Sequence, residues 1–335
     1  MLVLGVETSC DETSIAIVEN GKNVLSNLVS SSLSLHRKYG GVIPEIASRA
    51  HLEFIYPLAK EALKKAKVKI SDLGVISVIY GPGLNGSLLV GLSFAKAISF
   101  AHNLPLIGVD HIKAHLYAPL FLQKIPFPFI GLVVSGGHTS LFLVKNFANF
   151  TLLGRTVDDA AGEAFDKVAK ILGLGYPGGP LIERLAAFGE PSKIKFLCGN
   201  LEKKLNFSFS GIKTAVMYKV KYQVSPNVSG QASIKYQEKA NIAYAFQEAV
   251  FDDIAKKSML ACLMKKVKSL VVGGGVACNK RLRQKLNNAS SEYGINVYLA
   301  EAKYCLDNAA MVAGLGYQLY KKGAISNLTL NTKPS

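Results

Sequence analysis

Short apolar runs alternate with amphipathic stretches along most of the chain. Runs rich in Val, Ile and Leu and bounded by Gly, Asn or Ser indicate strands, whereas apolar residues recurring with a helical period indicate helices. Predicted strands cover residues 2–8, 14–19, 23–30, 74–80, 106–109, 129–134, 140–144, 269–272 and 296–299. Predicted helices cover 45–66, 87–103, 163–172, 180–188, 239–265, 280–291 and 307–321, with a shorter one at 111–115. The alternation predicts an α/β fold.

The opening pattern occurs twice, because each half begins with a strand, a polar turn and a second strand. The turns lie at residues 9–13 and 135–139, and the Pro-spaced stretch Lys124–Pro128 predicts a hinge between the halves. We therefore predict a first lobe formed by 1–123 plus 306–323 and a second lobe formed by 124–305. Residues 324–335 are expected to form a loose polar tail.

Composition narrows the class of protein. The 335 residues are 49% hydrophobic, which suffices for a large core and excludes a disordered chain. Five scattered cysteines without a CxxC pair predict no disulfide framework and favour a reducing cytoplasm. The apolar stretches at 84–101 and 127–144 are interrupted by polar residues, and the N-terminus lacks a signal-peptide pattern, so we expect no membrane association.

Charge indicates a polyanionic partner. The net charge of +16 on a protein of this size favours nucleic acid. Basic residues cluster at 60–69 and at 280–285. A solvated helix face is the favoured interpretation of the first cluster, and for the second both interpretations stay open.

Three glycine-rich turns follow predicted strands. Ser135-Gly136-Gly137-His138 presents backbone N–H groups that could face a phosphate, although an ordinary hairpin turn has the same pattern. In the segment from Gly273 to Asn279, a nucleotide could lie against the glycines and bond the Asn279 amide; the alternative is a plain helix–strand contact. The third turn, 81–87, lies where ligands bind in α/β sheets. GxGxxG and GxxxxGK[ST] are both absent.

Two histidines have the spacing of metal ligands. His111 and His115 are four residues apart, which places both imidazoles on one helical face. Asp307 is the candidate third ligand, and without it core or helix-end histidines would be the better interpretation. An N,N,O set suits Fe or Zn better than Mg.

Several carboxylates are further candidates for functional-site residues. Asp166 and Glu183 could reach ribose hydroxyls, and acidic residues at 158, 159 and 163 are partly explained by a helix N-terminus. Glu7, Asp11 and Glu12 lie at the first turn, where carboxylates orient a water, a metal or an attacking amine.

Together these segments resemble one family, the universal tRNA N6-adenosine threonylcarbamoyltransferases, once called O-sialoglycoprotein endopeptidases. The resemblance extends over nearly the whole chain in order and is closest to the bacterial branch. It is carried by the segments 5–13 (GVETSCDET), 40–45 (GGVIPE), 81–84 (GPGL), 111–115 (HIKAH), 134–139 (VSGGHT), 158–167 (DDAAGEAFDK), 176–180 (YPGGP), 207–211 (FSFSG), 273–279 (GGGVACN) and 307–308 (DN).

The resemblance implies an α/β, actin-like fold of the sugar-kinase and Hsp70 type, with two lobes led by duplicated β-hairpins. It implies a divalent metal, with Fe²⁺ favoured over Zn²⁺, on His111, His115 and Asp307. It also implies an adenylate site whose positions are Val133, Val134, Ser135, Gly136, Gly137, Asp166, Gly179 and Asn279, with Glu183 as an addition.

The activity implied by the resemblance is transfer of threonylcarbamoyl from threonylcarbamoyl-AMP to N6 of adenosine 37 in tRNAs reading ANN codons, with release of AMP. Asp11 or Glu12 would orient or deprotonate the amine. Implied partners are tRNA, an inactive paralogue of the same fold and a small P-loop ATPase, all in the cytoplasm.

Two other functions compete with this one. A metallopeptidase would need HExxH, but Ile112-Lys113-Ala114 separate the two histidines. A non-enzymatic ATP-binding scaffold of the same fold is the stronger rival, because a fold does not determine a function.

Overall fold

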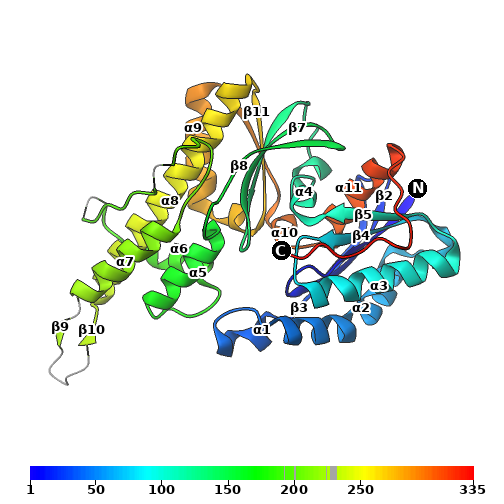
Figure 1. Ribbon diagram of the computed structural model, residues 1–335, viewed down its shortest axis with the longest axis horizontal. Helices are drawn as coiled ribbons and strands as arrows, with labels where there is room; N and C mark the ends of the chain where they lie inside the picture. Colours follow the sequence, from blue (N-terminus) through cyan, green and yellow to red (C-terminus); the bar gives the residue numbers. More distant parts are fainter. Residues whose placement is uncertain (192, 200, 224, 227–231) are drawn as a thin grey trace. The chain divides into compact units, whose positions relative to one another are not determined.

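The computed structural model describes residues 1–191, 193–199, 201–223, 225–226 and 232–335 (Figure 1). The chain divides into two compact units. The first unit comprises Met1–Phe127, Val144–Phe150 and Ala300–Ser335, and the second comprises Pro128–Leu143 and Thr151–Leu299. Each unit contains a five-stranded sheet with helices packed on it, which makes the chain an α/β protein.

The sheet of the first unit has the strand order β3-β2-β1-β4-β5. Its strands are β1 (Leu2–Glu7), β2 (Glu12–Glu19), β3 (Asn23–Ser31), β4 (Leu73–Gly81) and β5 (Leu106–Asp110). The first three strands pair antiparallel, while β4 runs parallel to β1 and β5 parallel to β4. The Val- and Ile-rich sequences of β1, β2, β4 and β5 suit strands whose two faces are both covered, whereas the edge strand β3 is more polar and more exposed.

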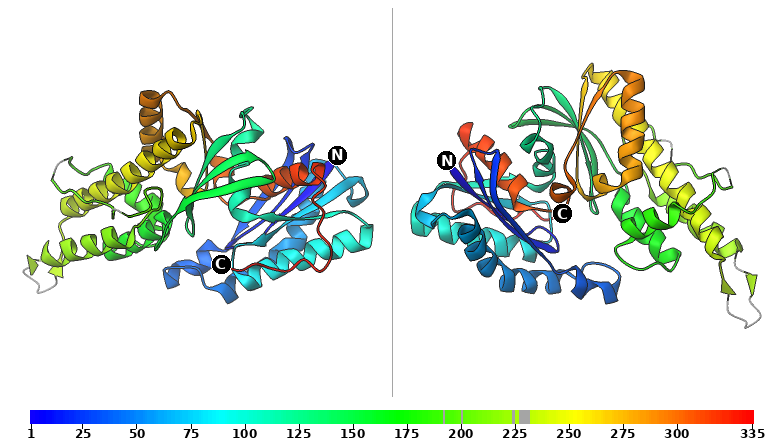
Figure 2. Two further views of the ribbon diagram at one scale, coloured as in Figure 1. Left: turned by 45° about the horizontal axis from the view of Figure 1, so that its top comes forward. Right: turned by 180° about the vertical axis from the view of Figure 1, so that it is seen from behind.

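Helices cover both faces of this sheet (Figure 1, Figure 2). The covering helices are α2 (Pro44–Ala66) and α3 (Asn85–His102) on one face and α11 (Ala309–Lys321) on the other. The unit also contains α1 (Leu33–His36), α4 (His111–His115) and α10 (Ala302–Cys305). On one face, Leu4 and Val6 of β1 join a core that contains Ile55 of α2 and Leu92 of α3. Gly5 lies between them in the strand and faces α11 on the other side.

The second unit has the strand order β12-β11-β6-β7-β8. Its strands are β6 (Phe129–Val134), β7 (Thr139–Asn146), β8 (Asn149–Arg155), β11 (Ser269–Gly273) and β12 (Asn296–Leu299), with a separate short pair, β9 (Ser225–Pro226) and β10 (Ala232–Ser233). Its helices are α5 (Ala161–Ile171), α6 (Gly178–Ala186), α7 (Ser210–Gln223), α8 (Tyr236–Lys265) and α9 (Lys280–Tyr293). In the core, the ring of Phe165 packs against those of Phe246 and Phe251.

Each strand and helix predicted from the sequence has a counterpart within a few residues. The longer elements β8 and α7 and the short elements α1, α10, β9 and β10 were not predicted. β8 is an edge strand with mostly exposed side chains, so it lacks the alternation that identifies a half-buried strand. α7 contains Gly211, Thr214 and Val216, which are poor helix formers.

The terminal segment is not the loose tail that the sequence suggested. Ser326 pairs with Leu106 of the edge strand β5, and its hydroxyl accepts a hydrogen bond from the Gly108 N–H at 3.0 Å. Further along, the Lys333 N–H donates to the carbonyl of Tyr80 at 2.7 Å. The segment therefore covers the backbone of β5, which would otherwise be an open sheet edge.

Gly5 allows α11 to approach β1 closely, and this predicts a stability effect. A Cβ atom at position 5 would lie 2.2 Å from the carbonyl oxygen of Ala309, a contact that only backbone movement can relieve. We expect Gly5→Ala to lower the free energy of unfolding by about 1–3 kcal/mol, measured by urea denaturation.

Gly41→Ala is the matched control, because a Cβ there would meet nothing within 4 Å. Equal stability of the two variants would show that the approach of α11 to β1 does not constrain the fold.

Candidate metal centre and glycine-rich turn

The helix α4 places two histidines side by side. β5 ends at Asp110, whose carboxylate accepts a hydrogen bond from the Lys113 N–H at 3.0 Å and so caps the helix. His111 and His115 lie one turn apart, with ring centroids separated by 4.7 Å. His115 is 0% exposed and His111 only 6%.

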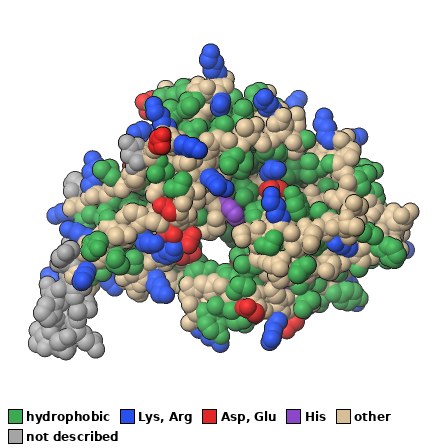
Figure 3. Space-filling view, viewed as in Figure 1, with side chains coloured by type: hydrophobic (Ala, Val, Ile, Leu, Met, Phe, Trp, Pro, Cys, Tyr) green, Lys and Arg blue, Asp and Glu red, His purple; other side chains and the backbone are tan. Residues whose placement is uncertain are grey.

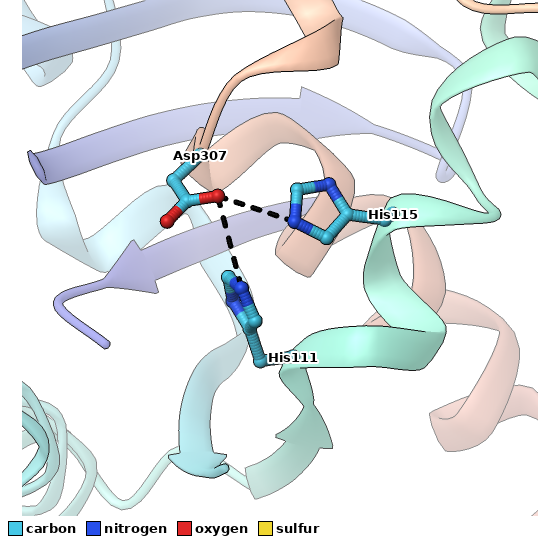
Figure 4. A group of neighbouring side chains, drawn as sticks. All are labelled: His111, His115 and Asp307. Atoms are coloured by element: carbon cyan, nitrogen blue, oxygen red, sulfur yellow. Dashed lines mark ion pairs between the residues drawn. The ribbon is translucent and has the colours of Figure 1, made fainter. Parts of the chain in front are cut away.

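Asp307 is brought to the histidines by the start of α11. The Ala309 N–H donates to Ser14 Oγ at 2.8 Å, and the Ala310 N–H donates to Asn27 Oδ1 at 3.2 Å. Side chains of β2 and β3 thus satisfy N–H groups that a helix N-terminus leaves without partners. Asp307 Oδ1 consequently lies 3.2 Å from Nε2 of His115 and 3.7 Å from Nε2 of His111 (Figure 4).

The three side chains fit a divalent metal. Their ligand atoms all lie within 4.8 Å of one another. Neither ring nitrogen of His115 has a hydrogen-bond partner, although the side chain is buried. A buried imidazole without hydrogen bonds is unfavourable unless another ligand takes its lone pair. Two imidazole nitrogens and one carboxylate oxygen form a donor set suited to Zn²⁺ or Fe²⁺.

The electrostatics also favour a cation at this point. Burial lowers the pKa of His111, but the carboxylates of Asp307 and Glu7 outweigh it and raise that pKa to about 9. Burial, together with the charges of Asp307 and Asp11, raises the pKa of Glu12 to about 9. Carboxylates crowded in this way repel one another, and a divalent cation would offset that repulsion.

The loop between β1 and β2 is held by two buried histidines, His36 and His51, that no pattern in the sequence identified. His51 of α2 lies with its Nε2 3.0 Å from the carbonyl oxygen of Cys10 and its Nδ1 2.7 Å from Thr13 Oγ1. The Ser32 hydroxyl donates to the carbonyl of Asp11 at 3.0 Å and also contacts His36. These contacts fix the backbone that carries Asp11 and Glu12, whose own charges act on each other and on Asp307.

The second unit contains the predicted glycine-rich turn. Val133 and Val134 end the buried strand β6, and the turn then closes with the Ser135 N–H donating to the carbonyl of His138 at 2.8 Å. The Ser135 amide is therefore already occupied, contrary to our expectation that it would face a phosphate. Among the described residues, none accepts a hydrogen bond from the amide of Gly136 or Gly137, and a Cβ at either position would meet nothing within 4 Å.

The remaining predicted positions of this unit are connected by hydrogen bonds to helix N-termini. Asp166 Oδ1 accepts from the Gly178 N–H at 2.6 Å, at the start of α6. Glu183 Oε1 accepts from the Lys280 N–H at 2.8 Å, at the start of α9.

Asn279 completes this arrangement. Its Oδ1 caps α9 by accepting from the Arg281 and Leu282 N–H groups, and its Nδ2 donates to Gln247. Next to the Asp166 contact, Gly179 leaves open space where a Cβ would point. The side chains of Asp166, Glu183 and Asn279 therefore position helices, a role that the sequence did not reveal.

On the face that Figure 3 shows, Lys and Arg side chains are scattered among other side chains and do not form one patch. In the α9 cluster, Arg281 makes a bidentate ion pair with Glu248, and Lys285 contacts the same carboxylate at 3.0 Å. Part of this cluster is therefore neutralised within the unit, which weakens it as a nucleic-acid surface. Of the described helices, none combines the length and apolarity needed to cross a membrane.

Comparison with known proteins identifies relatives over the whole chain. A sequence model of the family tRNA N6-adenosine threonylcarbamoyltransferase matches residues 23–314. The protein of that name from Thermodesulfovibrio yellowstonii is 49% identical over 336 residues, covering 99% of this chain and 98% of its own. The one from Thermosipho africanus is 49% identical over 337 residues, covering 100% of this chain and 99% of its own.

Solved structures share the fold at low identity. HypF from T. kodakarensis matches with a TM-score of 0.65 at 15% identity, covering 97% of this chain and 48% of its own. Component A of the (R)-2-hydroxyglutaryl-CoA dehydratase from Acidaminococcus fermentans matches with a TM-score of 0.55 at 16% identity, covering 97% of this chain and 99% of its own. These matches confirm the expected actin-like α/β fold.

The buried histidines predict stabilisation by added metal. A metal that binds only the folded protein at a concentration of 100 times its Kd should raise the free energy of unfolding by about 2.7 kcal/mol. We expect Zn²⁺ to do this for the native chain and not for His115→Ala, measured by chemical denaturation with and without the metal.

His102→Ala serves as the control, because His102 is an exposed residue at the end of α3. An equal effect of Zn²⁺ on all three proteins would place its binding elsewhere.

Proposed function

The chain belongs to the tRNA N6-adenosine threonylcarbamoyltransferase family, and we propose that it uses its His–His–Asp cluster and its glycine-rich turn to modify adenosine 37 of tRNAs reading ANN codons. The donor would be threonylcarbamoyl-AMP, and AMP would leave. The observation that carries this proposal is the buried cluster of His111, His115 and Asp307, since nucleotide binding by a non-enzymatic scaffold does not require a metal site on these side chains.

His111, His115 and Asp307 would hold the metal, with Fe²⁺ favoured and Zn²⁺ the alternative. When bound, a divalent metal supplies Lewis-acid polarisation of a carbonyl oxygen. The chain itself supplies the fixed positions, because α4 and the start of α11 are both anchored on the sheet of the first unit. An exocyclic amine is a poor nucleophile, so this positioning should provide much of the rate.

Asp11 and Glu12 would act on the attacking amine. The Ser32 hydroxyl donates to the carbonyl of Asp11, and His51 contacts the carbonyl of the preceding residue, Cys10. Glu12 is further oriented by the Ser31 hydroxyl, which donates to its Oε1 at 3.2 Å. Once ionised, a state that a bound cation would favour, a carboxylate held in this way can accept a hydrogen bond from the N6 amine and align the amine lone pair. Which of the two takes the proton is left open.

The adenylate would bind in the second unit, at the turn formed by Ser135, Gly136 and Gly137. Two adjacent amides without acceptors among the described residues, on glycines with open space beside them, suit the oxygens of a phosphate. Val133, Val134, Asp166, Gly179, Glu183 and Asn279 would shape the remainder of the site.

Macromolecular partners are also part of the proposal. They would be the substrate tRNA and two proteins, an inactive paralogue of the same fold and a small P-loop ATPase, in the cytoplasm. The paired helices α2 and α3 expose Leu52, Tyr56, Leu89 and Phe100, which are large apolar side chains suited to a protein interface.

The test is mass spectrometry of tRNA nucleosides after incubation with tRNA, threonine, bicarbonate, ATP and the bacterial partner proteins. We expect a threonylcarbamoyladenosine peak that requires this chain, is lost with His111→Ala and is retained with His102→Ala. The metal ligand is removed only in the first variant. A peak that persists with His111→Ala would exclude a role for the cluster, and its absence with the native chain would leave a nucleotide-binding scaffold.

The adenylate site predicts an effect of adding a methyl group to the turn. Gly137→Ala should fold normally, because its Cβ would meet no atom of the described chain within 4 Å. It would however occupy the space proposed for the phosphate, and we expect the affinity for AMP, measured by calorimetry, to fall about tenfold or more.

Gly211→Ala is the matched control, since a Cβ there also meets nothing within 4 Å. Unchanged AMP affinity with Gly137→Ala would move the phosphate away from this turn.

A further inference from the structure

Glu7 is a buried carboxylate that the proposed reaction does not use. It is the last residue of β1, and it is 0% exposed. Its Oε2 lies 3.0 Å from Nδ1 of His111, on the opposite side of the ring from the Nε2 that faces Asp307. Its Oε1 accepts a hydrogen bond from the Ser9 N–H at 2.6 Å.

Both oxygens of Glu7 therefore have defined roles. The backbone N–H of Ser9 can only donate, so Oε1 must act as an acceptor. Oε2 is likewise an acceptor when the carboxylate is ionised, and it favours a proton on Nδ1 of His111. A neutral imidazole with its proton on Nδ1 carries its lone pair on Nε2, which is the nitrogen that faces Asp307.

The second histidine has no equivalent support. Neither Nδ1 nor Nε2 of His115 has a hydrogen-bond partner, so hydrogen bonding does not select its tautomer. Ser9 Oγ lies 3.1 Å from the same Nδ1 of His111, but a hydroxyl can donate or accept and so selects no tautomer by itself. The Glu7 carboxylate is the group that can fix which nitrogen of His111 is available.

We propose that Glu7 is a positioning residue that holds His111 in the Nδ1-protonated tautomer and directs its Nε2 toward the metal. This inference rests on the proposed function, in which His111 is a metal ligand. Metal-bound histidines are commonly oriented by a carboxylate on their other nitrogen, and loss of such a partner typically lowers metal affinity 10–100-fold.

Glu7→Gln tests this role specifically, because the two oxygens of Glu7 have different partners. The Ser9 N–H requires an acceptor, so the amide oxygen of the new side chain should take the place of Oε1. The amide NH₂ would then face Nδ1 of His111 and donate to it. That arrangement favours the opposite tautomer, with the proton on Nε2, where it blocks ligation.

The readouts are Zn²⁺ affinity by calorimetry and, at an alkaline pH where the His111 ring is neutral, its tautomer by ¹⁵N NMR of the imidazole rings. For Glu7→Gln we expect affinity to fall about 10–100-fold and the proton of His111 to move from Nδ1 to Nε2. For Ser9→Ala, which keeps the backbone N–H and the Glu7 carboxylate, we expect less than a threefold change and the native tautomer.

Each outcome has a separate meaning. If the native chain does not bind Zn²⁺, the proposed metal site fails, whatever Glu7 does. If the native chain binds and Glu7→Gln binds equally well with the native tautomer, the role of Glu7 is refuted. Should Glu7→Gln fail to fold, the NMR spectrum of the native chain still decides, because a neutral His111 ring with its proton on Nε2 in the metal-free protein would overturn the proposal.

Discussion

The docking of the first turn of α11 on the sheet of the first unit is the contact on which the candidate metal centre depends. Asp307 is almost two hundred residues from His111 in the chain, so α4 cannot position it. Ser14 and Asn27 accept the N–H groups of Ala309 and Ala310, and Gly5 leaves the space that the carbonyl of Ala309 requires. Side chains of the strands accept hydrogen bonds from the N-terminal N–H groups of this helix. The same contacts therefore stabilise the fold and position Asp307, the third candidate ligand.

Much of this site could be predicted from the sequence, for identifiable reasons. The four-residue spacing of His111 and His115 has direct geometric meaning on a helix, and Asp307 follows from its place before the last predicted helix together with the family resemblance. The role of Glu7 could not be assigned in this way. Its partner is far away in the chain, and a buried acid at a strand end gives no local pattern that identifies a bond to an imidazole.

Contacts between residues that are far apart in the chain also explain why some roles in the second unit could not be predicted. Asp166, Glu183 and Asn279 are polar residues near glycines, a pattern that suggests ligand contacts. Asp166 and Glu183 instead hold distant helix N-termini, and Asn279 caps its own helix, so each has at least one oxygen already occupied. The glycines of the turn differ from these three residues, because their contribution to a ligand site would be the absence of a side chain. Gly136 and Gly137 keep space open in the folded chain, as their sequence indicated.

The surface of the chain and the interior of the first unit carry charges of opposite sign. The net charge of +16 is carried largely by exposed lysines, yet Glu7, Asp11, Glu12 and Asp307 lie near one another inside the first unit. Burying carboxylates near one another destabilises the fold unless a cation compensates, and burial together with the neighbouring carboxylates raises the pKa of Glu12. A polyanion would be attracted to the outside, whereas a divalent cation is the species that fits among these acids. The contact between Nδ1 of His111 and Glu7 gives one of these acids a partner, which leaves Asp307 as the carboxylate beside the candidate metal position.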